Sequence, residues 1–280
     1  MNGVTAMKKN LWDKEWKDLT RKEEKYRYKH CVAHKSVLAK LQKIVPKGMQ
    51  DKLDTAFVKA FQLIFEKGIA VIEKTYDKEK RQAEYKVREY AASIREDKRN
   101  VRAFRKKAGS YAAKNLLLSS AEGIGLGLLG VGLPDIPLFV SVILRNLYEI
   151  SLSFGYDYDR MEERFFQLKV IETALYSGEE MEERDENMNT MCRSLCGAKQ
   201  REPEELAQLT GELDAQIRKT AKALSDDMLY AKFLQSQPIV GAVGGATNIT
   251  VLKRISDYAM LKYRRRYLLD RKWGQENLPQ

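Results

Sequence analysis

Residues 120–159 read SAEGIGLGLLGVGLPDIPLFVSVILRNLYEISLSFGYDYD, the most apolar and glycine-rich stretch of a highly charged chain. Its glycines, between positions 123 and 132, precede Pro134-Asp135-Ile136-Pro137. Glycine lets backbones approach closely, proline is tolerated at a helix start, and an aspartate there can cap the first turn. The stretch therefore predicts a close-packed helical segment, a tight turn and a buried helix, which form a central hairpin.

The segments on either side of this hairpin also show helical spacing. Apolar residues recur every three or four positions in residues 49–75 and again in residues 160–176. This period is typical of amphipathic helices, and no run alternates apolar and polar residues as a strand would. Residues 179–186, EEMEERDE, are expected to form a solvated helix face. The sequence predicts an all-α protein, a multi-helix bundle around the Gly-rich central helical hairpin.

The chain divides at one clear break, Pro46-Lys47-Gly48. We expect a basic N-terminal helical region over residues 1–48 and an all-helical domain over residues 49–273. A short tail, residues 274–280, would follow.

The charge is unevenly distributed. The 280 residues have a formal net charge of +11, and residues 1–110 alone hold 29 Lys and Arg against 15 Asp and Glu. Such asymmetry indicates a polyanionic partner, either nucleic acid or an anionic membrane, although a lysine-rich solvated surface gives the same pattern. No recognised nucleic-acid-binding motif is present, so we favour the membrane. The candidate contacts are Trp12, Trp16, Arg264, Arg265 and Arg266.

Targeting and membrane signals are weak. Residues 1–16 lack an apolar core of the kind a signal peptide has, and three cysteines do not make a disulfide framework, so we expect a cytoplasmic protein. Phe233–Leu252 is uncharged and long enough to span a bilayer, but it contains glutamines, a proline and several glycines. A true span is not expected, whereas shallow or conditional insertion stays open.

Few residues point to catalysis or cofactors. Gly125–Gly130 matches GxGxxG, but a helical pattern precedes it where a nucleotide site needs a strand, so helix packing explains it better. A zinc site is a weaker interpretation, because the pairs that would form it lack the usual spacing. Its ligands would be His30, His34, Cys192 and Cys196. We expect no cofactor and assign no catalytic residue.

Four charged residues in the hairpin invite two interpretations. Arg145 and Glu149 lie one turn apart in the apolar helix, with Asp135 before it and Asp157 after it. Buried charges must be paired, so the structural interpretation is an ionic cluster that locks the hairpin. The functional interpretation is a polar pocket for a small ligand or a lipid headgroup. Other polar residues expected near such a pocket are Glu73, Lys74 and Asn248.

Three segments resemble the motifs of the EcsC family of bacterial proteins. The central one combines residues 134–137, Leu144-Arg145 and Phe154-Gly155-Tyr156-Asp157. An N-terminal one combines residues 65–68 with residues 72–75, and a C-terminal one covers Pro238 to Gly245 with Asn248. The resemblance spans roughly residues 50–270 in the right order.

The resemblance implies little chemistry. The family has no assigned biochemical role, and its founding member is encoded beside an ABC transporter. The pattern also looks like helical modules of some membrane-associated GTPases, but this chain has no GxxxxGK[ST] loop. We expect a non-enzymatic cytoplasmic protein at the inner membrane surface, accessory to a membrane transporter or to secretion. The alternative is an enzyme or a lipid- or small-ligand-binding protein with its site around Asp135, Arg145 and Asp157.

Overall fold

The computed structural model describes residues 2–30, 47–95, 97–126, 135–197, 212–236 and 246–273. All regular structure within these ranges is helical, so the predicted all-α class is confirmed. The elements are α1 (Asn2–His30), α3 (Lys47–Leu63), the π-helix η1 (Ile64–Gly68), α4 (Ile69–Glu73), α5 (Lys78–Ile94), α6 (Lys98–Leu126), α7 (Asp135–Ser153), α8 (Met161–Leu175), α9 (Gly178–Ser194), α11 (Leu213–Ser236) and α12 (Ala246–Trp273).

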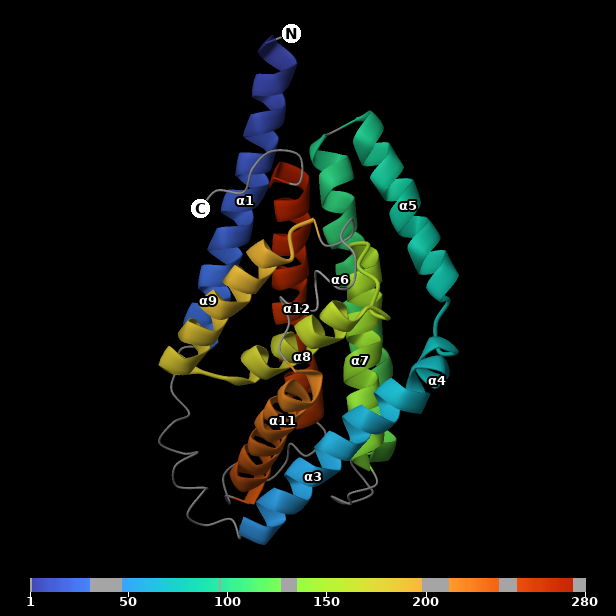
Figure 1. Ribbon diagram of the computed structural model, residues 1–280, viewed down its shortest axis with the longest axis vertical. Coiled ribbons are helices and arrows are strands. Elements are labelled where there is room, and N and C mark those ends of the chain that lie inside the picture. The colour runs from blue at the N-terminus through green and yellow to red at the C-terminus, as the bar shows by residue number, and fades with distance from the viewer. Residues whose placement is uncertain are drawn as a thin grey trace.

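The two arms of the predicted hairpin are α6 and α7, which pack along each other. The residues between them, 127–134, lie outside the described ranges, as does the second Gly-rich stretch, residues 237–245. Helix α12 contacts α1, α6, α7, α8 and α9, and is therefore the common partner of helices from both halves of the chain. Figure 1 shows α1, α12 and α6 side by side, with α3 crossing the lower end of the bundle.

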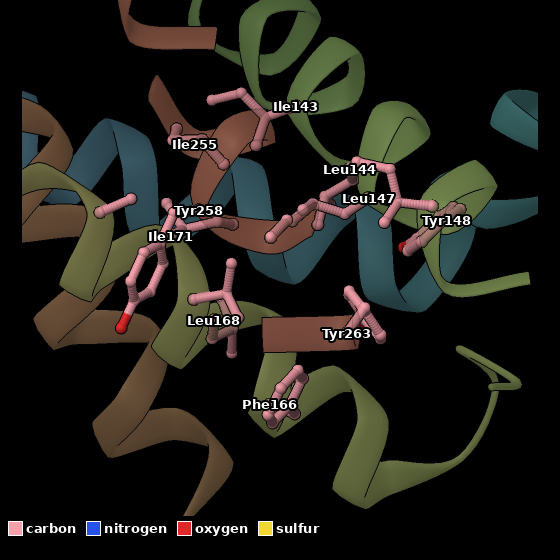
Figure 2. Close-up of a cluster of buried hydrophobic side chains, with 14 of the residues drawn as sticks. Ile143, Leu144, Leu147, Tyr148, Phe166, Leu168, Ile171, Ile255, Tyr258 and Tyr263 are labelled. Atoms are coloured by element: carbon pink, nitrogen blue, oxygen red, sulfur yellow. The ribbon is translucent and has the colours of Figure 1, made fainter. Parts of the chain in front are cut away.

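The core forms where α7, α8 and α12 meet (Figure 2). Leu144 and Leu147 of α7, Leu168 of α8 and Ile255 of α12 are each fully or almost fully buried. Burying one such side chain contributes roughly 1.5–3 kcal/mol, so this apolar cluster is the main source of stability. Its members follow the helical period seen in the sequence.

Helix α7 is the most apolar of the long described helices. Its segment Ile136–Ser153 is long and apolar enough to cross a membrane, with a mean hydropathy of 1.3, and 67% of it is buried inside the bundle. Core helices of soluble proteins pass the same test of length and composition. In this structure, α7 packs against α3, α5, α6 and α12.

Helices α3, η1 and α4 run on without a break up to a turn at residues 74–77. The π-helical turn Ile64–Gly68 inserts an extra residue into the ladder, and a Cβ on Gly68 would lie only 3.3 Å from Ile64 Cβ. Asp77 then caps α5, because its carboxylate accepts a hydrogen bond from the Lys80 amide at 2.8 Å. These local features fix the position of the turn relative to α5.

The acidic stretch of α9 is only partly solvated, which corrects the expectation of a wholly solvated face. Asp185 is buried; it accepts a hydrogen bond from the Tyr258 hydroxyl at 2.7 Å and pairs with Lys262 at 2.7 Å. It lies one turn after the buried Met181, on the inward face of α9. The correction follows from the helical period, which carries one of the acids to the core.

Helix α1 packs against α12 and α9. The predicted N-terminal region is thus in contact with the C-terminal helix of the bundle, although the division between residues 48 and 49 stays a prediction.

Candidate functional site at the junction of two motifs

The structure brings two separate motifs together. The turn after α4 ends the first motif, and the turn after α7 ends the second. The Tyr76 hydroxyl donates to the Tyr158 hydroxyl at 2.6 Å, and Tyr158 donates in turn to Glu73 Oε1 at 2.6 Å. We call the residues of this contact the motif junction: Glu73, Tyr76, Lys78, Tyr148, Tyr158 and Asp159.

Lys78 pairs with both carboxylates of the motif junction. Its Nζ lies 2.8 Å from Glu73 Oε1, 2.6 Å from Asp159 Oδ2 and 4.5 Å from the centre of the Tyr158 ring. Burial alone would raise the pKa of Glu73, but hydrogen bonds from Lys78 and Tyr158 outweigh it and hold this pKa below its usual range. Glu73 is therefore held as an ionised acceptor of hydrogen bonds from Lys78 and Tyr158.

Tyr148 is the unusual member of the junction. Its ring stacks on that of Tyr158, with centroids 4.0 Å apart and planes 15° from parallel. Its side chain is fully buried, yet its hydroxyl has no hydrogen-bond partner among the described residues. Desolvation raises the pKa of Tyr148 well above its usual value, so the hydroxyl is a neutral donor. Such an unmet buried group needs a physical explanation.

Two arginines lie beside the junction. Arg145 Nη2 donates to the Thr75 carbonyl at 3.2 Å, and Arg164 Nε donates to the Tyr158 carbonyl at 3.3 Å. The Arg164 guanidinium also lies 5.7 Å from the centre of the Phe65 ring, in the π-helix. Neither arginine is within ion-pair distance of a carboxylate in the part of the chain that the structure describes, and Arg145 Nε is buried without a partner there.

The predicted ion pair between Arg145 and Glu149 is wrong, because Glu149 has a different partner. Glu149 is paired with Arg81 of α5, whose Nε and Nη2 lie 3.1 and 2.9 Å from Glu149 Oε1. Arg81 also donates to Tyr111 at 2.9 Å. Arg145 turns to the Thr75 carbonyl because Glu149, although one helical turn away, is already engaged by a residue far off in the sequence.

The remaining predicted residues are dispersed. Asp157 is exposed and accepts a hydrogen bond from the Asp159 amide within its own turn, at 3.2 Å, and the side chain of Lys74 is exposed. Asp135 begins α7 and Asn248 lies in α12, but their side chains lie outside the described ones. Of the predicted set, the structure places Glu73 in the junction and Arg145 beside it.

Gly155 explains part of the second motif. Its φ of 78° is a left-handed conformation that favours glycine, and a Cβ there would lie 2.2 Å from Cζ of Tyr85. The glycine therefore lets α5 approach the turn after α7. Sequence reasoning missed Tyr85, Arg81 and Tyr158, because their roles depend on helices that are distant in sequence.

The predicted basic contact at Arg264, Arg265 and Arg266 is corrected by the structure. These residues are 4%, 9% and 2% exposed. Arg264 Nη2 pairs with Glu15 at 2.7 Å and its Nη1 with Asp18 at 2.9 Å, while Arg265 pairs with Glu23 at 2.5 Å. We call Glu15, Asp18 and Glu23 of α1, with Lys262, Arg264 and Arg265 of α12, the α1–α12 seam. Its cations are buried and paired with carboxylates, most of them in α1, and do not form a basic surface.

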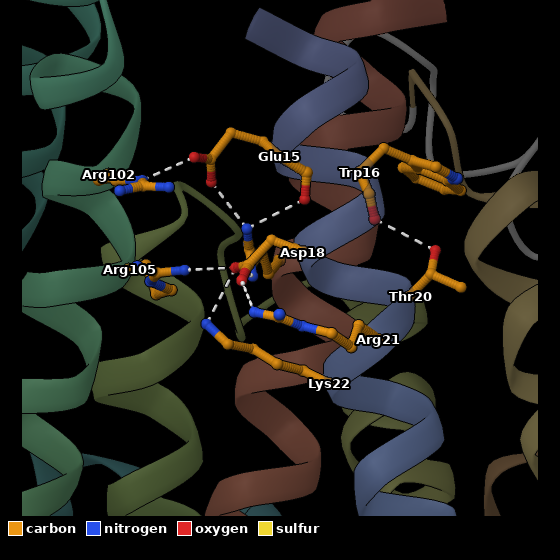
Figure 3. Close-up of polar contacts among 9 residues, drawn as sticks. Glu15, Trp16, Asp18, Thr20, Arg21, Lys22, Arg102 and Arg105 are labelled. Atoms are coloured by element: carbon orange, nitrogen blue, oxygen red, sulfur yellow. Dashed lines mark hydrogen bonds and ion pairs between the residues drawn. The ribbon is translucent and has the colours of Figure 1, made fainter.

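Arginines of α6 close the seam from the other side. Arg102 lies 2.7 Å from Glu15 and Arg105 lies 2.8 Å from Asp18. Figure 3 draws both contacts. Burial would raise the pKa of Asp18, but hydrogen bonds from Lys22 and Arg264 outweigh it and hold this pKa well below its usual range.

The aromatic residues predicted to touch a membrane are buried or partly buried in the bundle. Trp12 is buried, and Trp16 is partly buried under Arg265, whose Cζ lies 5.0 Å from its ring. Arg266 pairs with Glu163 at 2.7 Å and lies 4.0 Å from the Tyr156 ring. Burial corrects the prediction for Trp12 and for the three arginines, while for Trp16, which is only partly buried, it stays a prediction.

The zinc interpretation gains no geometric support. Cys192 and Cys196 are buried in the core, where burial raises the pKa of the Cys192 thiol to about 11. His30 packs on the Tyr26 ring with centroids 4.4 Å apart, and His34 lies outside the described residues. The described residues contain no group of three His, Cys, Asp or Glu side chains that could hold a metal ion.

Comparison with known proteins gives one result. The model of the EcsC protein family matches residues 13–268, nearly the whole chain. No curated protein matches the chain, and no solved structure matches it.

Proposed function

We propose that this chain, which belongs to the EcsC protein family, is a non-enzymatic cytoplasmic protein that binds the anionic inner surface of the membrane. The observation that carries the proposal is an apolar stripe on the outer side of α5. Val87, Tyr90 and Ile94 are 68%, 69% and 69% exposed. Their spacing of three and four places them on one helix face. Large apolar groups left together in water mark an interaction surface.

Basic residues border this stripe. Lys80 and Lys86 of α5 are exposed and lie on either side of it by helical position. We call Lys80, Lys86, Val87, Tyr90 and Ile94 the α5 outer face. Aromatic and aliphatic side chains with lysines beside them suit a helix that lies in the interface of an anionic bilayer. The opposite side of α5 is engaged by α6 and α7, so binding needs no unfolding of the bundle.

The energies are those of reversible attachment. A fully buried aliphatic side chain contributes roughly 1.5–3 kcal/mol, and a lysine near an anionic leaflet contributes about 1 kcal/mol. Three partly inserted side chains and two lysines therefore supply a peripheral contact. A second anchor, such as a partner protein in the membrane, would be needed for stable attachment.

A membrane transporter is the partner that the family resemblance favours. The founding member is encoded beside an ABC transporter, so we propose that the bundle is an accessory factor to a transporter or to a secretion process. The α5 outer face would hold the protein at the surface where such a partner lies.

Co-flotation with vesicles tests the proposal. The protein is mixed with phosphatidylcholine vesicles that contain increasing phosphatidylglycerol, at low and at high salt. We expect binding that rises with anionic lipid and weakens with salt. Replacing Val87, Tyr90 and Ile94 together by Ser should abolish it.

The matched control removes as many exposed apolar side chains elsewhere. Tyr28, Leu138 and Met161 are 84%, 47% and 54% exposed, and their joint replacement by Ser should leave flotation unchanged. Wild-type protein that stays at the bottom of the gradient at every lipid composition would refute the proposal. Equal loss in both triple variants would refute the assignment to α5.

A further inference from the structure

We propose that the motif junction binds the phosphate group of a ligand, held by Arg145, Tyr148 and Arg164. Each of these side chains contacts Tyr158 or the residue before Tyr76, the two tyrosines whose hydroxyls meet at the junction. Arg145 reaches the carbonyl of Thr75, next to Tyr76, while Arg164 reaches the carbonyl of Tyr158 and Tyr148 stacks on its ring. The site is therefore built by α7, α8 and the turn after α4.

Both unmet groups of this site, the Tyr148 hydroxyl and Arg145 Nε, can donate a hydrogen bond. The Tyr148 hydroxyl is fully buried and Arg145 Nε is buried, and neither has a partner among the described residues. A buried donor without a partner costs free energy, which an acceptor on a ligand would recover. A ligand that presents oxygen acceptors would satisfy both groups.

The local charge indicates that those acceptors are anionic. Within the junction, Lys78 pairs with Glu73 and Asp159, and the neighbouring Arg81 pairs with Glu149. Arg145 and Arg164 donate only to backbone carbonyls in the described part of the chain. The planar guanidinium matches a phosphate group with two parallel hydrogen bonds, so two arginines beside a tyrosine hydroxyl favour phosphate.

The position suits a ligand that approaches from the membrane. Lys78 of the junction is the first residue of α5, and Lys74 and Lys80 on either side of it in the sequence are exposed. A lipid headgroup and a free phosphate compound share the chemistry recognised here. The inference rests on the proposed function only for the lipid source, because binding of free phosphate needs no membrane.

The test uses inorganic phosphate and the full-length chain. Titration calorimetry should show saturable binding, and phosphate should raise the Tm of the wild type by mass action. Arg145→Met, Arg164→Met and Tyr148→Phe should each weaken the phosphate affinity by about tenfold. The control is Arg218→Met, because Arg218 is an exposed arginine of α11, and its affinity should equal that of the wild type.

A second arm separates the two sources. Flotation on vesicles with phosphatidic acid is compared between Arg145→Met and wild type, in the presence and absence of free phosphate. Loss of lipid binding in the variant, with competition by phosphate, supports a lipid headgroup. Phosphate binding with unchanged flotation supports a soluble ligand.

Two results would overturn the inference. One is a wild-type protein that shows no saturable phosphate binding, and the other is an affinity that is equal in wild type, Arg145→Met and Tyr148→Phe. Failure of the α5 proposal looks different, because flotation would then be lost while phosphate binding at the junction remained.

Discussion

The α1–α12 seam and the motif junction are both rich in charge, but they treat it differently. In the seam, Arg264 and Arg265 are each paired with carboxylates of α1. At the junction, Arg145 and Arg164 bond only to backbone carbonyls among the described contacts, and Tyr148 has a buried hydroxyl without a described partner. The arginines of the seam are fully paired in a structural contact, whereas the junction has hydrogen-bond donors without a described partner.

The difference separates two uses of polar groups in one bundle. A buried ion pair whose partners are all present holds helices in register, and removing one partner leaves an uncompensated charge. A buried donor without a partner costs free energy in the folded state, so its removal should be neutral or stabilising. Substitutions in the seam should therefore change stability, while substitutions of the donors beside the junction should change binding.

The largest expected effect is in the seam. Lys262→Met removes a fully buried cation that lies 3.1 Å from Glu23 and 2.7 Å from Asp185. Both buried carboxylates then lose their ion pair with Lys262. We expect a loss of about 3–5 kcal/mol in the free energy of unfolding. Thermal unfolding followed by circular dichroism measures it. The control, Lys253→Met, removes a lysine with 53% exposure and should cost at most about 0.5 kcal/mol. Equal Tm values for the two variants would contradict the structural role of the seam.

The next effect concerns the backbone beside the junction. Gly155→Ala puts a Cβ into the Tyr85 ring at a φ of 78°, so we expect a loss of about 2–4 kcal/mol. Urea denaturation of the variant measures it. Gly109→Ala is the control, because Gly109 lies inside α6 and a Cβ added there would have nothing within 4 Å, so this change should be neutral or stabilising by up to about 1 kcal/mol. A Gly155→Ala variant as stable as wild type would show that α5 does not approach the turn closely.

A smaller effect is expected from acid. The folded state holds the pKa of Asp18 well below its unfolded value of 3.8, so the unfolded state binds a proton first as the pH falls. The stability from Asp18 is therefore complete above about pH 5 and is lost as the pH drops below 3.8 towards the folded pKa. We expect the ionised carboxylate of this partly buried residue to contribute about 1–2 kcal/mol to the free energy of unfolding.

Asp18→Asn provides the comparison for that pH dependence. The variant should be less stable than wild type at pH 7, and the difference should shrink between about pH 5 and about pH 2. Urea unfolding at several pH values measures it. A difference that stays constant over this range would rule out the contribution of the ionised carboxylate.

The smallest effect is expected at the junction. Tyr148→Phe removes a buried hydroxyl that has no described partner, so stability should stay the same or rise by up to about 1 kcal/mol. Tyr263→Phe is the matched change in the core, where the Tyr263 hydroxyl donates to Glu163, and it should cost about 1–2 kcal/mol. Differential scanning calorimetry compares the two. A Tyr148→Phe variant that is the less stable of the pair would mean that this hydroxyl is already satisfied.

The helices themselves could be predicted from the sequence, because helical periodicity is a local property. The apolar spacing around Leu144 and Leu147 reports the face of α7 that meets the core, and both side chains are buried there. The break at Pro46-Lys47-Gly48 lies where α3 begins. The family resemblance, which rests on short motifs, agrees with the match over residues 13–268.

The partners of the charged residues could not be predicted in this way. Arg145 and Glu149 are one turn apart, which predicts a pair, but Glu149 is bound by Arg81, 68 positions away. Arg264, Arg265 and Arg266 form a basic run in the sequence, yet the acids that neutralise them lie in α1 and α8. Charge summed along a chain says nothing about which charges meet in space.

The sequence by itself determined the all-α class, the apolar face of each helix and the family, since each depends on spacing within one segment or on short motifs. Only the tertiary structure decided which polar groups are used in folding and which remain available. That choice depends on contacts such as Tyr76 with Tyr158 and Glu23 with Arg265, whose partners are separated by 82 and 242 positions. Packing of helices that are distant in sequence brings these groups within hydrogen-bond distance. No local sequence pattern shows which of them will meet.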